Sequence, residues 1–574
     1  MGAKPEKKEI FMRHKLGIVA LICCAVLFMT ASVFMFAACE ETEEDTTANL
    51  TVTATQVENE QKVNVGFETD FVYDSVTVSV IHDGTVSYKH TYKSADVSET
   101  PLQVPAFYGK QTIKVQLKKG KAVCTRQKEV PVFAQVYNIA PLTATMPVTM
   151  FSLSLPEITE NYTIPTFVWF KRSEAWNYDN MPENVYTVPV ASLRQIKGNS
   201  NQKTIYKMTN AWIKELYDIN PSSHFNLFYN DYFGYGWLDA TVARGIPTEN
   251  YTVSLLSDGT ASFHYFNKRL NNKNYESTYA KMKADYETLK TEIAAQGSYI
   301  ERGSYIISAE GAREYAFVMA KEEPNLTWWL TRANGTLGTE KVDGDVTVYN
   351  KIVSELEGTK ILIKDLKKLY SNLSEENCEM IRKLYDFGGS LLTEAVTQNK
   401  KPMILLGTWA YSEDRFADYV KATRAFYGTE KYVYYYKGHP KSPTNSVPGK
   451  LEQLEALGLI DVDSTISAEL FFFTYPPCVG SGYQSSTFLS TTDEQTGAIW
   501  GVRKGKVGQS YEPNLDAFIS PLDHFDTTYG KYLDSEALDR YMLVEFRDTS
   551  VYDFGIYDNT TETIVYYKNG VKAD

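Results

Sequence analysis

The sequence predicts an α/β protein with two doubly wound lobes behind a small β-sandwich. Between residues 49 and 136, short segments of alternating apolar residues follow one another without helical periodicity. From residue 137 onward, strand-like segments alternate with helical ones, which favours parallel sheets covered on both faces. The 574 residues are enough for three or four domains of about 150 residues each.

The first 39 residues predict an export signal. Basic residues over 4–15 precede an uncharged run over 16–38, which is long enough to cross a bilayer. The run ends in Phe36-Ala37-Ala38-Cys39, which resembles a bacterial lipoprotein cleavage box and makes Cys39 the expected lipid attachment site. The alternative is an uncleaved signal anchor. Both place the folded part at the cell membrane on its extracytoplasmic face, behind an acidic linker over 40–48.

Residues 49–136 predict a sandwich of immunoglobulin type. Its expected strands alternate at Val63, Val65 and Phe67, at Val76, Val78 and Val80, and at Ile113, Val115 and Leu117. No catalytic pattern occurs in this segment. The net charge of −13 argues against a nucleic-acid partner, whose binding surface would be basic. The cysteine spacing shows neither a metal site nor a disulfide framework.

The two lobes are expected over residues 137–375 and 376–574, and both are Rossmann-like. Strands of the first lobe are predicted at 148–155, 166–170, 185–190, 225–229 and 251–256, with a helix marked by Ile205, Met208, Trp212 and Leu216. In the second lobe, strands at 403–406 and 431–436 flank a helix over 416–426. The C-terminal tail could pack back on the first lobe.

Polar residues follow two of these strands. Asp258 comes after the strand at 251–256, and His439 comes after the strand at 431–436. Ligands of open α/β sheets bind outside the carboxyl ends of the strands, so both residues are candidates for a site. Further on, Glu469 opens an apolar run, and residues 479–486 predict a small-residue loop that cradles a phosphate at a helix start. Each feature alone is also typical of an ordinary turn.

Together these residues give the chain a resemblance to the bacterial sialyltransferases of GT-B fold that use CMP-sialic acid. Five segments match in the family's order: Ser257-Asp258-Gly259, Gly407-Thr408-Trp409, Lys437-Gly438-His439-Pro440, Ile466-Ser467-Ala468-Glu469, and Val479-Gly480-Ser481 with Ser485-Ser486-Thr487-Phe488. The matches are dense only over residues 400–490. Some members of the family also carry an N-terminal immunoglobulin-like domain.

The resemblance implies a metal-independent, inverting transfer of sialic acid to a terminal, galactoside-like hydroxyl. Asp258 would act as the general base, and His439 would face the leaving CMP phosphate. The remaining matched residues would bind substrate: Lys437 the nucleotide, Glu469 the ribose, Ser485 and Ser486 the phosphate, and Gly407, Thr408 and Trp409 the sugar region. No cofactor is implied. The expected partners are a CMP-sugar donor, a glycan acceptor and the membrane.

Two departures from the family leave other functions open. Ser257 replaces the first acid of the family's acidic pair, and residues 225–234 do not match the segment that contacts the acceptor. In addition, CMP-sialic acid is made inside cells, whereas this chain carries an export signal. One alternative is therefore a non-catalytic surface lipoprotein that binds sialylated glycan or a nucleotide. The other is a related transferase that uses a different nucleotide sugar.

Overall fold

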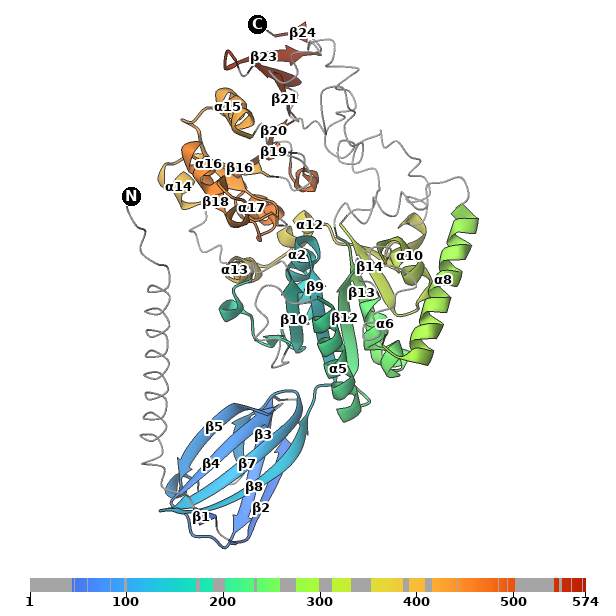
Figure 1. Cartoon of the computed structure of the whole chain (residues 1–574), viewed down its shortest axis with the longest axis vertical. Coiled ribbons are helices and arrows are strands. Elements are labelled where there is room, and N and C mark those ends of the chain that lie inside the picture. The colour runs from blue at the N-terminus through green and yellow to red at the C-terminus, as the bar shows by residue number, and fades with distance from the viewer. Residues whose placement is uncertain are drawn as a thin grey trace, which may run out of the picture. The chain divides into compact units, whose positions relative to one another are not determined.

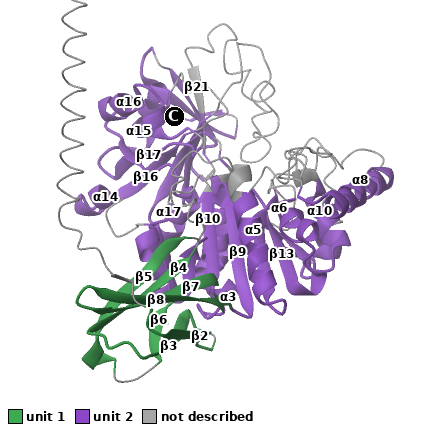
Figure 2. Cartoon of the chain, turned by 60° about the horizontal axis from the view of Figure 1, so that its bottom comes forward, with its two compact units in different colours: residues 1–133 green, residues 134–574 purple. Residues whose placement is uncertain are grey.

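The structure is a computed structural model with two compact units, residues 1–133 and 134–574 (Figure 2). It describes residues 44–45, 47–58, 60–82, 84–97, 101–171, 176–188, 202–231, 235–258, 275–298, 312–331, 353–385, 392–407, 416–440, 442–483, 485–492, 494–500, 541–546, 550–558, 560–569 and 571–573. The predicted export signal with Cys39 lies outside these ranges, as do Thr408 and Trp409. Of Ser486 the structure describes the backbone and not the side chain.

The first unit contains two sheets, of orders β1-β8-β7-β4-β5 and β2-β3-β6. Their strands are β1 (Glu44–Asp45), β2 (Leu50–Gln56), β3 (Lys62–Thr69), β4 (Ser75–His82), β5 (Thr85–Lys93), β6 (Leu102–Pro105), β7 (Gly109–Lys119) and β8 (Ala122–Val132). β1 pairs parallel with β8, and the other pairs are antiparallel. The predicted alternation is confirmed, because Val63, Val78 and Val115 are fully buried. The immunoglobulin type stays a prediction.

The second unit begins with a seven-stranded parallel sheet of order β11-β10-β9-β12-β13-β14-β15. Its strands are β9 (Val136–Thr143), β10 (Thr166–Lys171), β11 (Val185–Thr187), β12 (His224–Asn230), β13 (Tyr251–Leu256), β14 (Leu326–Leu330) and β15 (Ile361–Ile363). Its helices include α5 (Gln202–Ile219), α6 (Gly236–Ala240), α8 (Tyr275–Gln296) and α10 (Ala312–Glu322), shown in Figure 1. The strands predicted at 166–170, 225–229 and 251–256 are confirmed.

Helices cover both faces of this sheet, as adjacent residues of β12 show. Phe228 packs against Phe151, with ring centroids 5.2 Å apart, whereas Tyr229 packs against Tyr206 of α5 at 5.5 Å. Successive side chains of a strand point to opposite faces. The prediction of a parallel sheet between helical layers is therefore confirmed for the first lobe.

The predicted strand at 148–155 is wrong, because these residues form α2 (Thr145–Leu153) and the start of α3 (Leu155–Ile158). All residues of α2 from Pro147 to Leu153 are buried, and a short run that is buried all round has no period that separates helix from strand. Strand β9, which contains Pro141, was not predicted either. Proline disfavours a central strand, but β9 pairs with β12 only up to Ile139, so Pro141 lies beyond that pairing.

The second sheet has nine strands in the order β18-β17-β16-β19-β20-β21-β22-β23-β24. They are β16 (Lys401–Leu406), β17 (Tyr432–Lys437), β18 (Ile460–Val462), β19 (Val479–Tyr483), β20 (Thr496–Trp500), β21 (Tyr541–Phe546), β22 (Phe554–Asp558), β23 (Thr563–Lys568) and β24 (Val571–Lys572). The first five strands in this order are parallel, and the rest add an antiparallel meander. The described part of the C-terminal tail thus belongs to this sheet.

Helices α14 (Thr393–Thr397), α15 (Phe416–Tyr427), α16 (Lys450–Ala456) and α17 (Ala468–Thr474) accompany the second sheet. The predicted strands at 403–406 and 431–436 and the helix at 416–426 are confirmed. The prediction of a loop over 479–486 is wrong for its first five residues, which form β19. Gly482 adopts φ +113°, and a Cβ there would lie 2.5 Å from the backbone nitrogen of Leu406. The close approach of β16 thus requires glycine at 482, whereas a Cβ at Gly480 would meet the rings of Phe472 and Phe488.

Helices α12 (Leu366–Ser371) and α13 (Glu375–Leu384) lie in the segment of the chain that connects the two sheets. α12 contacts both α2 and α17, and the rings of Tyr370 and Phe473 lie 5.9 Å apart. Buried residues of both sheets, among them Leu142 and Ile404, belong to one apolar cluster. The two lobes therefore share part of their hydrophobic core.

Candidate functional site

The parallel register of the second sheet brings the ends of four strands to one edge. Leu406 pairs with Lys437 on one side and with Gly482 on the other, and Lys437 pairs in turn with Val462. The residues that follow these strands therefore lie at a common carboxyl edge. This is where open α/β sheets place their ligands.

Lys437 ends β17 with a buried side chain that is 5 % exposed. Its Nζ donates to the backbone oxygens of Gly438, at 3.4 Å, and Ser464, at 3.2 Å. Burial lowers the pKa of the amine to about 8, against the opposing effect of the charges on Glu469 and Asp463. The lysine thus ties the turn that carries His439 to the loop between β18 and α17.

Glu469 lies in the first turn of α17 and is 4 % exposed. The hydroxyl of Ser467, the residue before the helix, donates to its carboxylate oxygen Oε2. The helix N-terminus also favours a negative charge at this place. The Ser467 hydroxyl and the helix N-terminus thus fix the orientation of this buried carboxylate.

His439 follows β17 and is partly buried, and its backbone oxygen accepts from the nitrogen of Ser442 at 2.8 Å. Gly407 lies beside this turn, because its nitrogen donates to the oxygen of Lys437 at 2.9 Å. Ser485 follows β19, and its hydroxyl caps the single 3-10 turn Ser486–Leu489 by accepting from the nitrogen of Thr487 at 3.3 Å. The predicted helix start after the small-residue segment is therefore only this short turn.

Asp258 lies at the carboxyl edge of the first sheet, two residues beyond β13, and is partly buried. Ser257 precedes it with no exposed surface, and its nitrogen donates to the oxygen of Trp329 at 3.0 Å. The structure thus gathers Gly407, Lys437 and His439 at one edge. It places Asp258 at the corresponding edge of the other sheet.

Asp231, a fully buried carboxylate directly after β12, was not predicted as a site residue. Its Oδ2 accepts from the indole Nε1 of Trp328 at 3.3 Å. Beside it, Asn230 donates to Thr143 at 2.9 Å and accepts from Tyr206 at 3.3 Å. The signal for Asp231 was its position one residue beyond a strand, comparable to that of Asp258.

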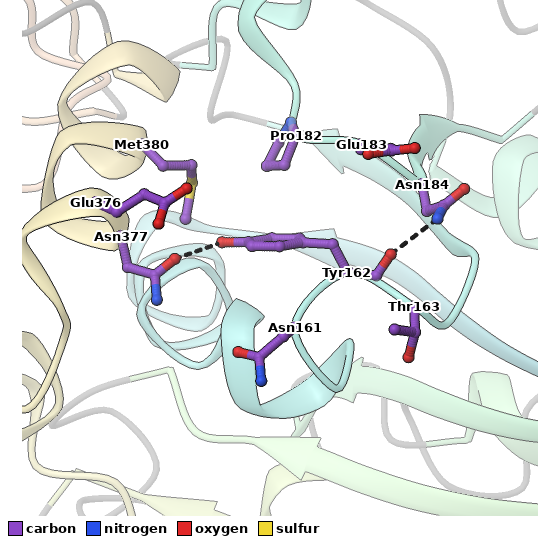
Figure 3. A pocket seen from close by; sticks show the side chains of 9 residues that line it. All are labelled: Asn161, Tyr162, Thr163, Pro182, Glu183, Asn184, Glu376, Asn377 and Met380. Carbon is purple, nitrogen blue, oxygen red and sulfur yellow. Dashed lines mark hydrogen bonds between the residues drawn. The ribbon is translucent and has the colours of Figure 1, made fainter.

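A cavity of about 660 Å³ lies at the opposite, amino-terminal end of β10 and β11 (Figure 3). The Tyr162 hydroxyl donates there to Oδ1 of Asn377 on α13 at 3.0 Å, and the Asn184 side chain donates to the backbone oxygen of Tyr162 at 2.8 Å. Burial, aided by the charge of Glu376, raises the pKa of Tyr162 to about 12. The hydroxyl therefore stays protonated and links α13 to the first lobe.

Within the described ranges, no group of three or more His, Cys, Asp and Glu side chains could hold a metal ion. None of the helices in the described part of the chain has both the length and the apolar character needed to span a bilayer.

Several solved structures similar to this chain are sialyltransferases from Photobacterium. The enzyme of Photobacterium damsela is 14% identical, with 86% of this chain and 97% of that chain covered and a TM-score of 0.48. A 2,6-sialyltransferase of another Photobacterium species, bound to CMP and lactose, is 13% identical, with coverages of 80% and 89% and a TM-score of 0.47. The α-2,3-sialyltransferase of Photobacterium phosphoreum is 12% identical, with coverages of 68% and 96% and a TM-score of 0.47.

No protein-family model matches the chain, and no curated protein matches it.

Proposed function

We propose that the protein is a glycosyltransferase that moves sialic acid from CMP-sialic acid to a galactoside-like hydroxyl with inversion. One observation supports this most. The intact Lys437-Gly438-His439-Pro440 motif closes a parallel strand, and its buried lysine connects it to the loop that leads to Glu469. The edge thus combines an imidazole, which can donate to a phosphate, with a held carboxylate, which can accept from ribose hydroxyls.

In this proposal the second lobe binds the donor. His439 contacts the CMP phosphate, since an imidazole with a pKa near neutrality can donate a charged hydrogen bond. Glu469 accepts hydrogen bonds from the ribose hydroxyls, and Ser485 and Ser486 contact the phosphate. Lys437 acts through the loop that it fixes, because its amine is bonded to two backbone oxygens.

The first lobe activates the acceptor. Asp258 takes the proton of the acceptor hydroxyl as its oxygen bonds to the anomeric carbon of the sialic acid. The bond from that carbon to the CMP phosphate oxygen breaks, and CMP leaves with a hydrogen bond or proton from His439. Direct displacement inverts the anomeric carbon, and closure of the lobes excludes the competing water.

The deciding experiment measures transfer from CMP-sialic acid to lactose by the full chain in detergent. We expect sialyllactose of inverted configuration by NMR, and calorimetric binding of CMP but not of UDP. Absence of CMP binding would overturn the proposal. Binding of CMP without transfer would favour the non-catalytic alternative, for which the replacement of the first acid by Ser257 is the motivating observation.

We further propose that a lipid on Cys39 holds the protein at the extracytoplasmic face of the membrane. The uncharged run before Cys39 and its small-residue cleavage box support this. Metabolic labelling with palmitate should mark the wild type and not Cys39→Ser, and trypsin added to intact cells should release the folded part. An unlabelled wild type that stays in the membrane would indicate a signal anchor instead.

A further inference from the structure

The cavity at the amino-terminal end of β10 and β11 is separate from the carboxyl edge of the first sheet (Figure 3). β10 has six residues and a strand rises about 3.3 Å per residue, so its two ends lie roughly 20 Å apart. The cavity volume of about 660 Å³ falls within the range of small-molecule sites, about 300–1,000 Å³. A small ligand can therefore bind here without occupying the carboxyl edge.

The lining of this cavity is polar and carries negative charge. Its nine described residues are three asparagines, two glutamates and one each of Tyr, Thr, Pro and Met, so none of them is basic. A phosphate or a sialic acid carboxylate would meet the charges of Glu183 and Glu376 without a cation in the lining to balance it. The lining thus disfavours anionic ligands.

Several polar groups of the lining are left for a ligand. Oδ1 of Asn377 accepts from the Tyr162 hydroxyl, whereas its Nδ2 forms no hydrogen bond with the described residues. The same holds for the side-chain amide of Asn161 and the carboxylates of Glu183 and Glu376. Amides offer donors and acceptors, and carboxylates offer acceptors. A molecule with several hydroxyl groups can use all four side chains.

The aromatic ring of Tyr162 gives the cavity an apolar surface. Figure 3 shows this ring in the middle of the lining, with Pro182 and Met380 on one side and Asn161 on the other. The bond to Asn377 fixes the orientation of the ring. A pyranose has C–H groups on its faces and hydroxyls at its edge, which suits one flat ring with polar groups around it. An ammonium ligand is typically enclosed by several rings, and only one aromatic residue is among the described lining residues.

The backbone beside the cavity has an uncommon conformation. Asn161 and Tyr162 have φ angles of +55° and +65°, and Asn184 has a φ of +59°. The Asn184 side chain donates to the backbone oxygen of Tyr162 at 2.8 Å and accepts from the Tyr186 hydroxyl at 2.9 Å. Non-glycine residues keep such a backbone only where their surroundings fix it, and they are concentrated at functional sites. The lining is therefore preorganised.

We propose that this cavity binds a neutral saccharide, with one pyranose ring stacked on Tyr162. Asn161 exchanges hydrogen bonds with the sugar hydroxyls, and Asn377 donates to them through Nδ2. Glu183 and Glu376 accept from the remaining hydroxyls. The site holds a glycan on the first lobe while the carboxyl edges stay open, and the inference does not depend on the proposed transferase function.

The test follows the ¹³C-methyl signal of Met380, assigned with Met380→Leu, in the full chain in a detergent without a sugar headgroup. The probes are lactose, maltose and chitobiose, which are all uncharged disaccharides. We expect at least one of them to shift the signal saturably. Its dissociation constant should rise about tenfold in Glu376→Gln and in Asn161→Gly, because each loses hydrogen bonds to the sugar. Glycine accepts the φ of +55° at position 161 without strain.

Glu379→Gln is the matched control for Glu376→Gln. Both are exposed carboxylates of α13, but Glu379 pairs with Arg382 and does not line the cavity, so its variant should keep the wild-type affinity. A Met380 signal that none of the three sugars moves would overturn the inference, and so would a shift caused by choline chloride alone. Equal sugar affinity in the wild type, Asn161→Gly and Glu376→Gln would also overturn it, because sugar bound only at a carboxyl edge gives that result.

Discussion

At the carboxyl edge of the second sheet, polar side chains form hydrogen bonds with residues that are close in the chain. At the carboxyl edge of the first sheet, the hydrogen bonds join residues that are far apart in the chain. Ser467 is two residues from Glu469, and Lys437 is 27 residues from Ser464. In the first sheet, Asp231 bonds to Trp328 across 97 residues, and Asn230 to Thr143 across 87. The donor side is thus encoded by local motifs, and the acceptor side depends on strand order.

The largest expected effect tests whether the two edges serve one reaction. We expect Asp258→Ala and His439→Ala each to lower kcat by about 10²-fold or more, the usual range for a general acid or base. If both act in one transition state, the double variant should lose less than the product of the single losses. Transfer kinetics with CMP-sialic acid and lactose measure this. Full activity of either single variant would show that the substituted residue, and the sheet edge that carries it, takes no part in the reaction.

The next effect concerns the buried amine of Lys437 and appears as a pH dependence of stability. Its pKa is about 8 in the folded state against 10.5 ordinarily, so between these values the unfolded chain holds more protons. The free energy of unfolding therefore rises with pH from about 8 upward, by about 3 kcal/mol over the full window. Buried tyrosines with raised pKa values, such as Tyr162, oppose this above pH 10.

Urea unfolding between pH 7 and 9.5 should show this rise in the wild type and not in Lys437→Met. A result of equal slopes would mean that the amine is not held as the structure has it. The contrast between the two edges would then no longer be supported by the hydrogen bonds of Lys437.

A smaller effect tests the orientation of Glu469. Ser467→Ala removes a hydrogen bond to a buried carboxylate, which contributes about 1.5–3 kcal/mol. We expect the dissociation constant for CMP to rise about tenfold, equivalent to about 1.4 kcal/mol. Ser446→Ala is the matched control, because its exposed hydroxyl donates to the oxygen of Pro443 in the same lobe. Equal CMP affinity in both variants would contradict the role of Glu469 in the ribose contact.

The same contrast explains what the sequence could and could not predict. Strands β12, β13, β16 and β17 and the polar residues that follow two of them were predicted, because each is a property of one short segment. Asp231 was not predicted because its bond to Trp328, 97 residues away in the chain, depends on the strand order. The loop predicted at 479–486 was wrong for residues 479–483, because Gly480 faces the rings of Phe472 and Phe488 and Gly482 faces the backbone of Leu406, contacts that the sequence does not show.

The smallest expected effect comes from the opposite end of the first sheet, where the structure predicts stability without chemistry. Tyr162→Phe removes the bond to Asn377 that links α13 to the first lobe, and should lower the free energy of unfolding by about 1 kcal/mol. Tyr186→Phe removes a hydroxyl that donates to Asn184 on the same side, without touching α13, and serves as the control. Both variants should keep the wild-type kcat, since neither residue lies at a carboxyl edge. A kcat loss in Tyr162→Phe alone would show that the attachment of α13 takes part in catalysis, because the lobe contact would then limit the reaction.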